Sequence, residues 1–210
     1  MAMRLRLVTT VREGDSGRTM DERELVRAAR RGDEEAFAAL VRRYSPGLHR
    51  TVARMLSDES EAWDVVQMTF LKAWQRLDRY DSRWSVSTWL YRIATNLSID
   101  LMRARSSRER AQQAGGEHLL RVVGDGEPTS RAADERELER VMGRLLTRLT
   151  PQQRAAFVLR ELEGLPSSEV AEAIGCTQTT VRNHVFQARK VLRRELELSY
   201  PEYLPGAPGE

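Results

Sequence analysis

Residues 166–196, PSSEVAEAIGCTQTTVRNHVFQARKVLRREL, hold the clearest structural signal in the chain. Gly175 is placed to end one helix in the left-handed conformation, which glycine adopts without a steric penalty. Thr177, two residues later, is a residue type that caps the N-terminus of a helix. We therefore predict helices over 167–174 and 178–196, joined by about three residues, which is the connection of a helix-turn-helix.

The second of these helices has one apolar and one polar face. Its apolar stripe is spaced for burial against the first helix and comprises Val181, Val185, Ala188 and Leu192. The polar face carries Arg, Asn and Gln, the side chains that read base edges in the major groove. The residues that we expect to contact DNA are Gln178, Thr179, Arg182, Asn183, Phe186, Gln187 and Lys190. A helical hairpin with a solvated basic face is the other interpretation of this pattern.

The composition fits a helical protein and excludes several kinds of site. The chain has 210 residues, of which 40% are hydrophobic and 31% charged, with a net charge of +3. The single cysteine, Cys176, excludes an internal disulfide and a cysteine-based zinc site, and we interpret it as a small core residue. The three histidines are far apart, and no segment is apolar for long enough to cross a membrane. We expect a cytoplasmic protein without cofactor or metal.

Helical periodicity begins at Asp21 and no segment shows the alternation of a strand, which predicts an all-α fold. Further helices are expected near 21–31, 34–43, 46–57, 60–79, 86–105, 134–148 and 151–163. Pro46–Gly47 is expected to separate the second and third of these helices. The predicted organisation is a disordered extension over 1–20, a helical domain over 21–105, a flexible linker over 106–133, a second helical domain over 134–197 and a C-terminal tail over 198–210.

The predicted helix over 60–79 has a second apolar feature outside its core stripe. The core stripe comprises Ala62, Val66, Phe70, Ala73 and Leu77. The opposite face mixes apolar and polar side chains and comprises Asp64, Gln67, Met68, Leu71 and Gln75, with Trp74 at its edge. Such a face is typical of a protein-binding surface, unless other helices of the domain cover it.

Aromatic and basic residues cluster around the start of the helix over 86–105. Tyr80, Arg83 and Trp84 lie in the preceding loop, and aromatic residues beside arginines are typical of single-strand binding. The alternative is that the aromatic residues are packed in the core, which we favour for Trp89 and Tyr91. The helix itself has an expected core stripe of Val86, Leu90, Ile93, Leu97 and Leu101. Its expected second stripe comprises Arg92, Asn96, Ile99 and Arg103.

Taken in order, these segments resemble a known family. Residues 64–74, DVVQMTFLKAW, and 87–100, STWLYRIATNLSID, resemble region 2 of bacterial sigma factors. Residues 149–161, LTPQQRAAFVLRE, through 188–194, ARKVLRR, resemble region 4. With only regions 2 and 4 in evidence, the chain resembles the extracytoplasmic-function (ECF) group of the sigma-70 superfamily.

The resemblance implies a promoter-specificity subunit of RNA polymerase. The polymerase β′ coiled coil would bind the face carrying Asp64, Gln67, Met68, Leu71 and Trp74. The −10 element would be bound and opened by Tyr80, Arg83, Trp84, Arg92, Asn96, Asp100 and Arg103. The helix-turn-helix would bind the −35 element and its inner side the β flap, and an anti-sigma protein would hold the factor inactive.

Two positions depart from the family pattern. Met68 stands where an acidic residue is common, and Val86 stands where phenylalanine is common, with Trp84 close by in sequence. The loop is therefore expected either to capture a different base or to hold the base differently. A stand-alone helix-turn-helix regulator is the second hypothesis, but the chain shows no obvious dimerisation segment. An enzyme is the third, and no nucleophile–base grouping, metal cluster or nucleotide loop supports it.

Overall fold

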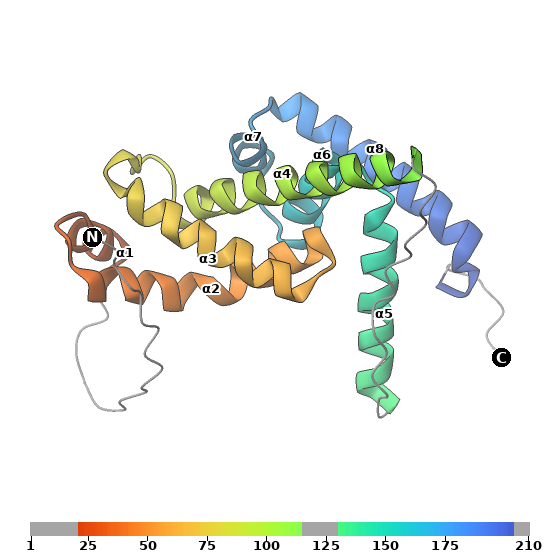
Figure 1. The fold of residues 1–210 in the computed structure, drawn as a ribbon, viewed down its shortest axis with the longest axis horizontal. Coiled ribbons are helices and arrows are strands. Elements are labelled where there is room, and N and C mark those ends of the chain that lie inside the picture. The colour runs from red at the N-terminus through yellow and green to blue at the C-terminus, as the bar shows by residue number, and fades with distance from the viewer. Residues whose placement is uncertain (1–20, 115–129, 204–210) are drawn as a thin grey trace.

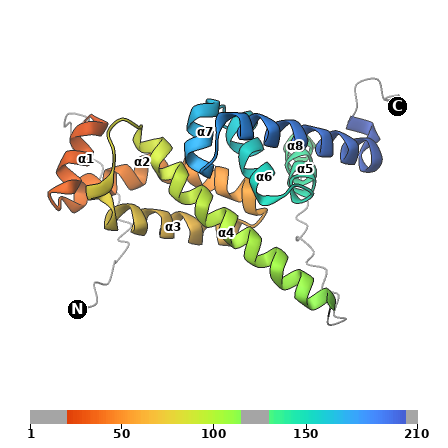
Figure 2. The ribbon, with the colours of Figure 1, turned by 90° about the horizontal axis from the view of Figure 1, so that it is seen from above.

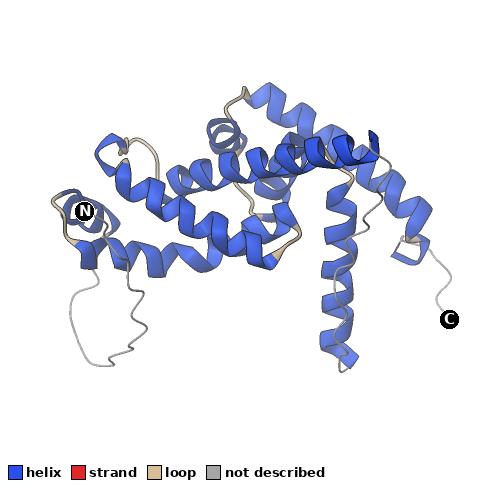
Figure 3. Cartoon of the chain, viewed as in Figure 1, coloured by secondary structure: helices blue, strands red, loops and turns tan. Residues whose placement is uncertain are grey.

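The computed structural model describes residues 21–114 and 130–203, and within those ranges it contains helices and no strand (Figure 3). The elements follow in the order α1 (Glu22–Arg30), α2 (Glu34–Leu56), α3 (Glu59–Gln75), a short 3-10 turn η1 (Leu77–Arg79), α4 (Val86–Ala114), α5 (Ser130–Thr147), α6 (Pro151–Phe157), a π turn η2 (Val158–Leu162), α7 (Ser167–Ile174), α8 (Gln178–Ser199) and η3 (Pro201–Tyr203). The expected extension over 1–20 and much of the expected linker lie outside the described residues.

Side-chain caps fix where several helices begin. Asp33 Oδ1 accepts hydrogen bonds from the backbone N–H groups of Glu35 and Ala36, each at 3.0 Å. Thr150 and Gln153 form a reciprocal capping box at the start of α6, followed by Pro151 in the first turn. These bonds satisfy N–H groups that have no partner within the helix, so the starts of α2 and α6 are encoded locally.

The predicted break at Pro46–Gly47 is wrong, because α2 continues through both residues. Proline removes one helical hydrogen bond and disturbs the preceding turn. Leu40 lies before Pro46 and Leu48 and Val52 after it, and all three are at most 2% exposed. Burial of one continuous apolar face therefore offsets the local cost of the proline.

Two further helix boundaries differ from the prediction. Helix α4 runs to Ala114 instead of ending near 105, and α5 begins at Ser130 instead of near 134. Part of the expected linker over 106–133 is therefore helical, and its remainder, 115–129, lies outside the described residues. No helix in the described part of the chain is both long and apolar enough to cross a membrane.

Helices α1–α4 form one helical unit, and α5–α8 form a second unit that packs against it (Figures 1 and 2). Helix α7 lies on α4, and the start of α6 meets the C-terminal end of α2. There the buried Arg154 donates a hydrogen bond from Nη1 to the Met55 carbonyl at 2.8 Å. Arg54 Nη1 pairs with Glu163 Oε1 at 2.8 Å across the same boundary.

Contact between the units changes which residues of α4 are buried. Ile99, which was predicted in the second stripe and not in the core stripe, is only 5% exposed and is a core residue. Ile93, Leu97 and Leu101, predicted in the core, are half-buried. The reason is that α2 and α3 contact α4 from one unit while α6 and α7 contact it from the other. The small polar residues Thr88, Thr95 and Ser98 are also buried, and Thr88 donates a hydrogen bond to Glu169 of α7.

Candidate nucleic-acid interface

The predicted helix-turn-helix is confirmed in its local geometry. Helix α7 ends at Gly175, which has a φ of 68° in the left-handed region. Thr177 caps α8, because its side-chain oxygen accepts a hydrogen bond from the backbone N–H of Thr180 at 3.1 Å. The predicted inner stripe is buried and comprises Val181, Val185, Ala188 and Leu192. The turn therefore fixes α8 with its polar face directed outward.

The polar face of α8 is exposed along its length. Phe186 is 65% exposed, which is unusual for a phenylalanine in a packed helical unit. The other predicted DNA-contacting residues are also exposed, namely Gln178, Thr179, Arg182, Asn183, Gln187 and Lys190. Arg189 differs from them, because it pairs with Glu161 at the end of η2. The surface combines free amide and guanidinium groups with one exposed aromatic ring.

The outer face of α3 is also open. Met68 is 43% and Leu71 is 40% exposed, and Asp64 and Gln67 are exposed beside them, so no other described helix covers this face. Trp74 is half-buried and packs on Phe37 of α2, with ring centroids 4.8 Å apart. Sequence reasoning missed Trp63, which is 47% exposed and lies one turn before Gln67. The face is therefore longer than predicted and more apolar.

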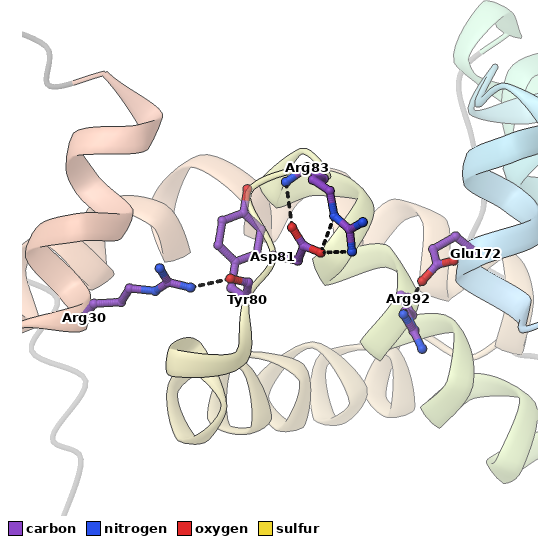
Figure 4. Close-up of polar contacts among 6 residues, drawn as sticks. All are labelled: Arg30, Tyr80, Asp81, Arg83, Arg92 and Glu172. Atoms are coloured by element: carbon purple, nitrogen blue, oxygen red, sulfur yellow. Dashed lines mark hydrogen bonds and ion pairs between the residues drawn. The ribbon is translucent and has the colours of Figure 1, made fainter.

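The loop before α4 is held by bonds within itself (Figure 4). The Tyr80 hydroxyl donates to the Trp84 carbonyl at 2.6 Å, and the Tyr80 ring packs on Trp89 with centroids 5.2 Å apart. Burial, followed by the charge of Glu22, raises the pKa of Tyr80. Arg83 donates from its backbone N–H and from Nε to Asp81, at 3.0 and 2.7 Å, and these bonds lower the Asp81 pKa. Tyr80 therefore supports the loop, whereas Arg83 lies at its exposed edge.

Helix α1 supplies a support for this loop that sequence reasoning missed. Arg30 donates from Nε to the Leu77 carbonyl at 2.9 Å and from a second nitrogen to the Tyr80 carbonyl (Figure 4). Glu22 accepts hydrogen bonds from the Val86 backbone N–H at 3.3 Å and from the Tyr44 hydroxyl of α2. No local sequence signal reveals these contacts, because α1 and the loop are far apart in the chain.

Val86, which departs from the family pattern, is a core residue. Its side chain is only 3% exposed, so it does not present an open surface to a base. Trp84, two residues earlier, is half-buried, with its carbonyl bonded to Tyr80. Of the loop residues that were predicted to bind DNA, Arg83 is the most exposed.

Four residues predicted to bind DNA project from α4. Arg92, Asn96, Asp100 and Arg103 are exposed, and Asp100 lies 3.9 Å from Arg103. Arg92 pairs with Glu172 of α7, a contact across the two units (Figure 4). The first three of these residues line a hollow of about 330 Å³ between the end of α3 and α4. Its remaining lining residues, several of them basic, are Lys72, Arg76, Arg79, Trp89, Ile93 and Leu97.

A second hollow, of about 350 Å³, lies within the C-terminal unit. Its lining is mainly apolar and includes Leu138, Met142, Phe157, Leu192, Leu196 and Tyr203. Among the residues that the structure describes, no group of His, Cys, Asp and Glu is arranged to hold a metal ion. Cys176 is half-buried, and burial raises the pKa of its thiol.

Known protein families match both helical units of the chain. A model of sigma-70 region 2 matches residues 40–108, and a model of sigma-70 region 4 matches residues 139–192. The RNA polymerase sigma-H factor of Pseudomonas aeruginosa is 33% identical over 184 residues, covering 84% of this chain and 94% of that protein. The ECF RNA polymerase sigma factor SigW of Bacillus subtilis is 32% identical over 176 residues, covering 81% and 94%.

Two solved structures are similar over most of the chain. The structure of CnrH in complex with the cytosolic domain of CnrY matches with a TM-score of 0.63 and 27% identity, covering 85% of this chain and 98% of that one. The sigma factor RpoE of Bartonella quintana, solved with the anti-sigma factor NepR, matches with a TM-score of 0.60 and 25% identity. That match covers 78% of this chain and 98% of RpoE.

Proposed function

Because the chain belongs to the ECF group of the sigma-70 family, we propose that its exposed faces on α3, α4 and α8 are its contacts with polymerase and promoter. The protein binds core RNA polymerase and directs promoter-specific transcription initiation, and its relatives do not favour a stand-alone regulator. We further propose that it has no catalytic activity of its own and acts in the cytoplasm, where transcription takes place.

Core polymerase is proposed to bind the outer face of α3. Asp64 and Gln67 would supply hydrogen bonds, and Met68 and Leu71 would supply apolar contact with the β′ coiled coil. Trp74 would contribute through its packing on Phe37, which fixes the end of this face. Exposed apolar side chains flanked by polar ones are what such an interface requires, since burial of the apolar surface drives association.

The −10 element is proposed to bind along the exposed loop edge and α4. Arg83 lies at the loop edge and Arg92, Asn96, Asp100 and Arg103 project from the helix, while Tyr80 and Trp84 maintain the loop. Arg30 of α1 holds the loop, so the loop has its shape before DNA binds. Such a pre-formed loop lowers the entropy cost of capturing an unpaired base.

The −35 element is proposed to bind the polar face of α8. Arg182, Asn183 and Gln187 are suited to base edges, and Phe186 to a thymine methyl group. Lys190 is suited to a phosphate, as are Arg193 and Arg194 further along the helix. The apolar hollow of the C-terminal unit, behind α8, is the proposed site for the β flap.

Anti-sigma proteins are the third class of partner. Both CnrH, solved with the cytosolic domain of CnrY, and RpoE, solved with the anti-sigma factor NepR, resemble this chain in fold. We propose that an anti-sigma protein binds this chain while its two helical units are close together. The units would then separate on polymerase, so that α4 and α8 reach two promoter elements at once.

The observation that carries this function is that an open, partly apolar face on α3 and an open base-reading face on α8 lie on one chain. Purified protein should bind promoter duplex weakly alone, because opening DNA costs free energy that core contacts must offset. Addition of core polymerase should give specific binding and transcripts. The measurement is DNA retention and run-off transcription with and without core. Tight sequence-specific binding by the isolated chain would contradict the proposal.

A further inference from the structure

Helix α7 places two carboxylates against the helix that is proposed to bind the −10 element. Glu172 pairs with Arg92, one of the proposed −10 residues, and Figure 4 shows the two side chains meeting between the units. One turn earlier on α4, Thr88 donates a hydrogen bond to Glu169 Oε2 at 2.6 Å. We call Glu169 and Glu172 the α7 acid pair. A cation and a hydroxyl of α4 are therefore occupied by anionic oxygens of the same chain.

The influence of the α7 acid pair extends to the loop before α4. The hydrogen bond with Asp81 raises the pKa of Arg83, and the charge of Glu172 adds to that rise. The hydroxyl of Ser85, the last loop residue, lies 2.7 Å from Thr88 Oγ1, the atom that is bonded to Glu169. The acids of α7 therefore act on the exposed edge of the loop as well as on α4.

The face of α4 that makes these two contacts is polar, whereas a permanent core contact would be apolar. Thr88, Arg92 and Thr95 follow one another at spacings of four and three residues, so they share one face of the helix. Thr95 is 1% exposed, and its hydroxyl has no hydrogen-bond partner among the residues that the structure describes. A buried hydroxyl without a partner is costly and uncommon in a native protein. Such a face suits a helix that is uncovered in a second state of the chain.

Simple adhesion between the two units is the competing explanation for the α7 acid pair. Adhesion can use any pair of opposite charges, as it does where Arg54 of α2 meets Glu163. It does not explain why the carboxylates of α7 meet α4 at an arginine and a hydroxyl, which are groups that bind DNA phosphates. Nor does it explain why a proposed −10 residue, Arg92, is the cation that is used.

We propose that the α7 acid pair takes the place of DNA phosphates on α4, so that the closed chain excludes DNA from part of its own −10 surface. This inference rests on the proposed function and adds the regulation of that surface. Arg92 and Thr88 donate to carboxylate or to phosphate oxygens, but not to both at once. Binding of DNA to α4 and closure of the units therefore oppose each other, each by the same factor. An anti-sigma protein that holds the units together would exclude −10 DNA without touching α4.

The test measures binding of single-stranded −10 DNA to the full chain, alone and within holoenzyme. The DNA sequence is selected from a random pool by the unmodified holoenzyme, and affinity at low salt is read from the anisotropy of a dye on the strand. The variant is Glu169→Gln with Glu172→Gln. The matched control is Glu34→Gln with Glu139→Gln, which makes the same change in net charge at two exposed acids away from the contact.

The free variant should bind the DNA more tightly than the free control. The expected factor is about 5- to 30-fold, because one exposed ion pair and one hydrogen bond to a charged acceptor no longer favour the closed state. Within holoenzyme, where the units are proposed to be apart, variant and control should bind alike. Equal binding there also shows that the variant is folded.

The outcomes separate this proposal from the proposed function. Equal affinity of the free variant and the free control would overturn it, because the carboxylates would then not compete with DNA. A difference that persists within holoenzyme would also overturn it, since the acids would then repel DNA whether or not the units are closed. Both results leave the proposed function standing, because run-off transcription by the unmodified holoenzyme tests that function directly. If the unmodified holoenzyme selects no sequence, both proposals fail.

Discussion

Two carboxylates of α7 hold the second helical unit against α4, and removal of their charges should loosen that contact. Glu169 Oε2 accepts a hydrogen bond from Thr88 Oγ1 at 2.6 Å, and Glu172 pairs with Arg92. The perturbation is Glu169→Gln combined with Glu172→Gln. Glutamine keeps the size of the side chain and an acceptor oxygen, so the change removes charge with little loss of packing.

The expected magnitude follows from the burial of each contact. The side chains of Arg92 and Glu172 are 51% and 33% exposed, so their ion pair contributes only about 0.2–1 kcal/mol in water. Thr88 is 2% exposed, and a hydrogen bond to a charged acceptor is worth ~1.5–3 kcal/mol, roughly twice the neutral bond that glutamine retains. Together the substitutions should weaken the contact by about 1–2 kcal/mol, or roughly 5- to 30-fold in the ratio of closed to separated units.

The assay is single-molecule energy transfer on the free chain. One dye is attached at Arg42→Cys in α2 and the other at Arg194→Cys in α8, with Cys176→Ser removing the native thiol. The double glutamine variant should show more molecules with long distances. The control is Glu34→Gln with Glu139→Gln, two exposed acids away from the contact. If the double variant and the control give the same distance distribution at low salt, these carboxylates do not hold the units together.

Other substitutions probe individual surfaces. Gln67→Ala with Leu71→Ala should lower core affinity by about 2 kcal/mol or more, as for central interface residues, and unchanged affinity in a core titration would remove that assignment. Arg182→Ala should weaken DNA binding by about 1–3 kcal/mol and relax the base preference at one −35 position. If a binding array shows an equal loss of affinity on all promoters, Arg182 contacts a phosphate instead. Gly175→Ala places a side chain at a φ of 68° and should destabilise the C-terminal unit by about 1–2 kcal/mol, visible as a lower Tm. Because burial raises the pKa of the Cys176 thiol, less thiolate exists at a given pH, and alkylation should be slower than in the unfolded chain and accelerate only at higher pH. Equal alkylation rates by mass spectrometry would refute that expectation.

The sequence predicted well where the signal is local. The turn at Gly175 and the cap at Thr177 are each decided by residues within a few positions, and both were predicted correctly. The buried stripe of α8 was also predicted correctly. Its apolar residues occupy one narrow face, so only that face can pack against the rest of the unit. The open face of α3 followed from the same periodicity.

The failures came from contacts between distant segments. Pro46 did not break α2, because the burial of residues on both sides of it outweighs a local penalty. Ile99 was misplaced because periodicity within one helix does not show that a second unit covers α4. Arg76 and Arg79 were not predicted as part of a site for a similar reason. They line a hollow that exists only because α4 lies beside the end of α3. Arg30 supports a loop that the sequence does not connect with α1.

The contact between Arg154 and the end of α2 encloses a charged side chain between the two units. Burial, with Arg105 close by, lowers the pKa of Arg154 to about 10, so enclosing this cation between the units costs free energy. The Met55 carbonyl returns part of that cost through one hydrogen bond. When the units part, water regains access to both groups, and hydration of the guanidinium offsets the lost bond. A contact of this kind keeps the two units in register at a small net gain in free energy, which is compatible with the proposed separation of the units on polymerase.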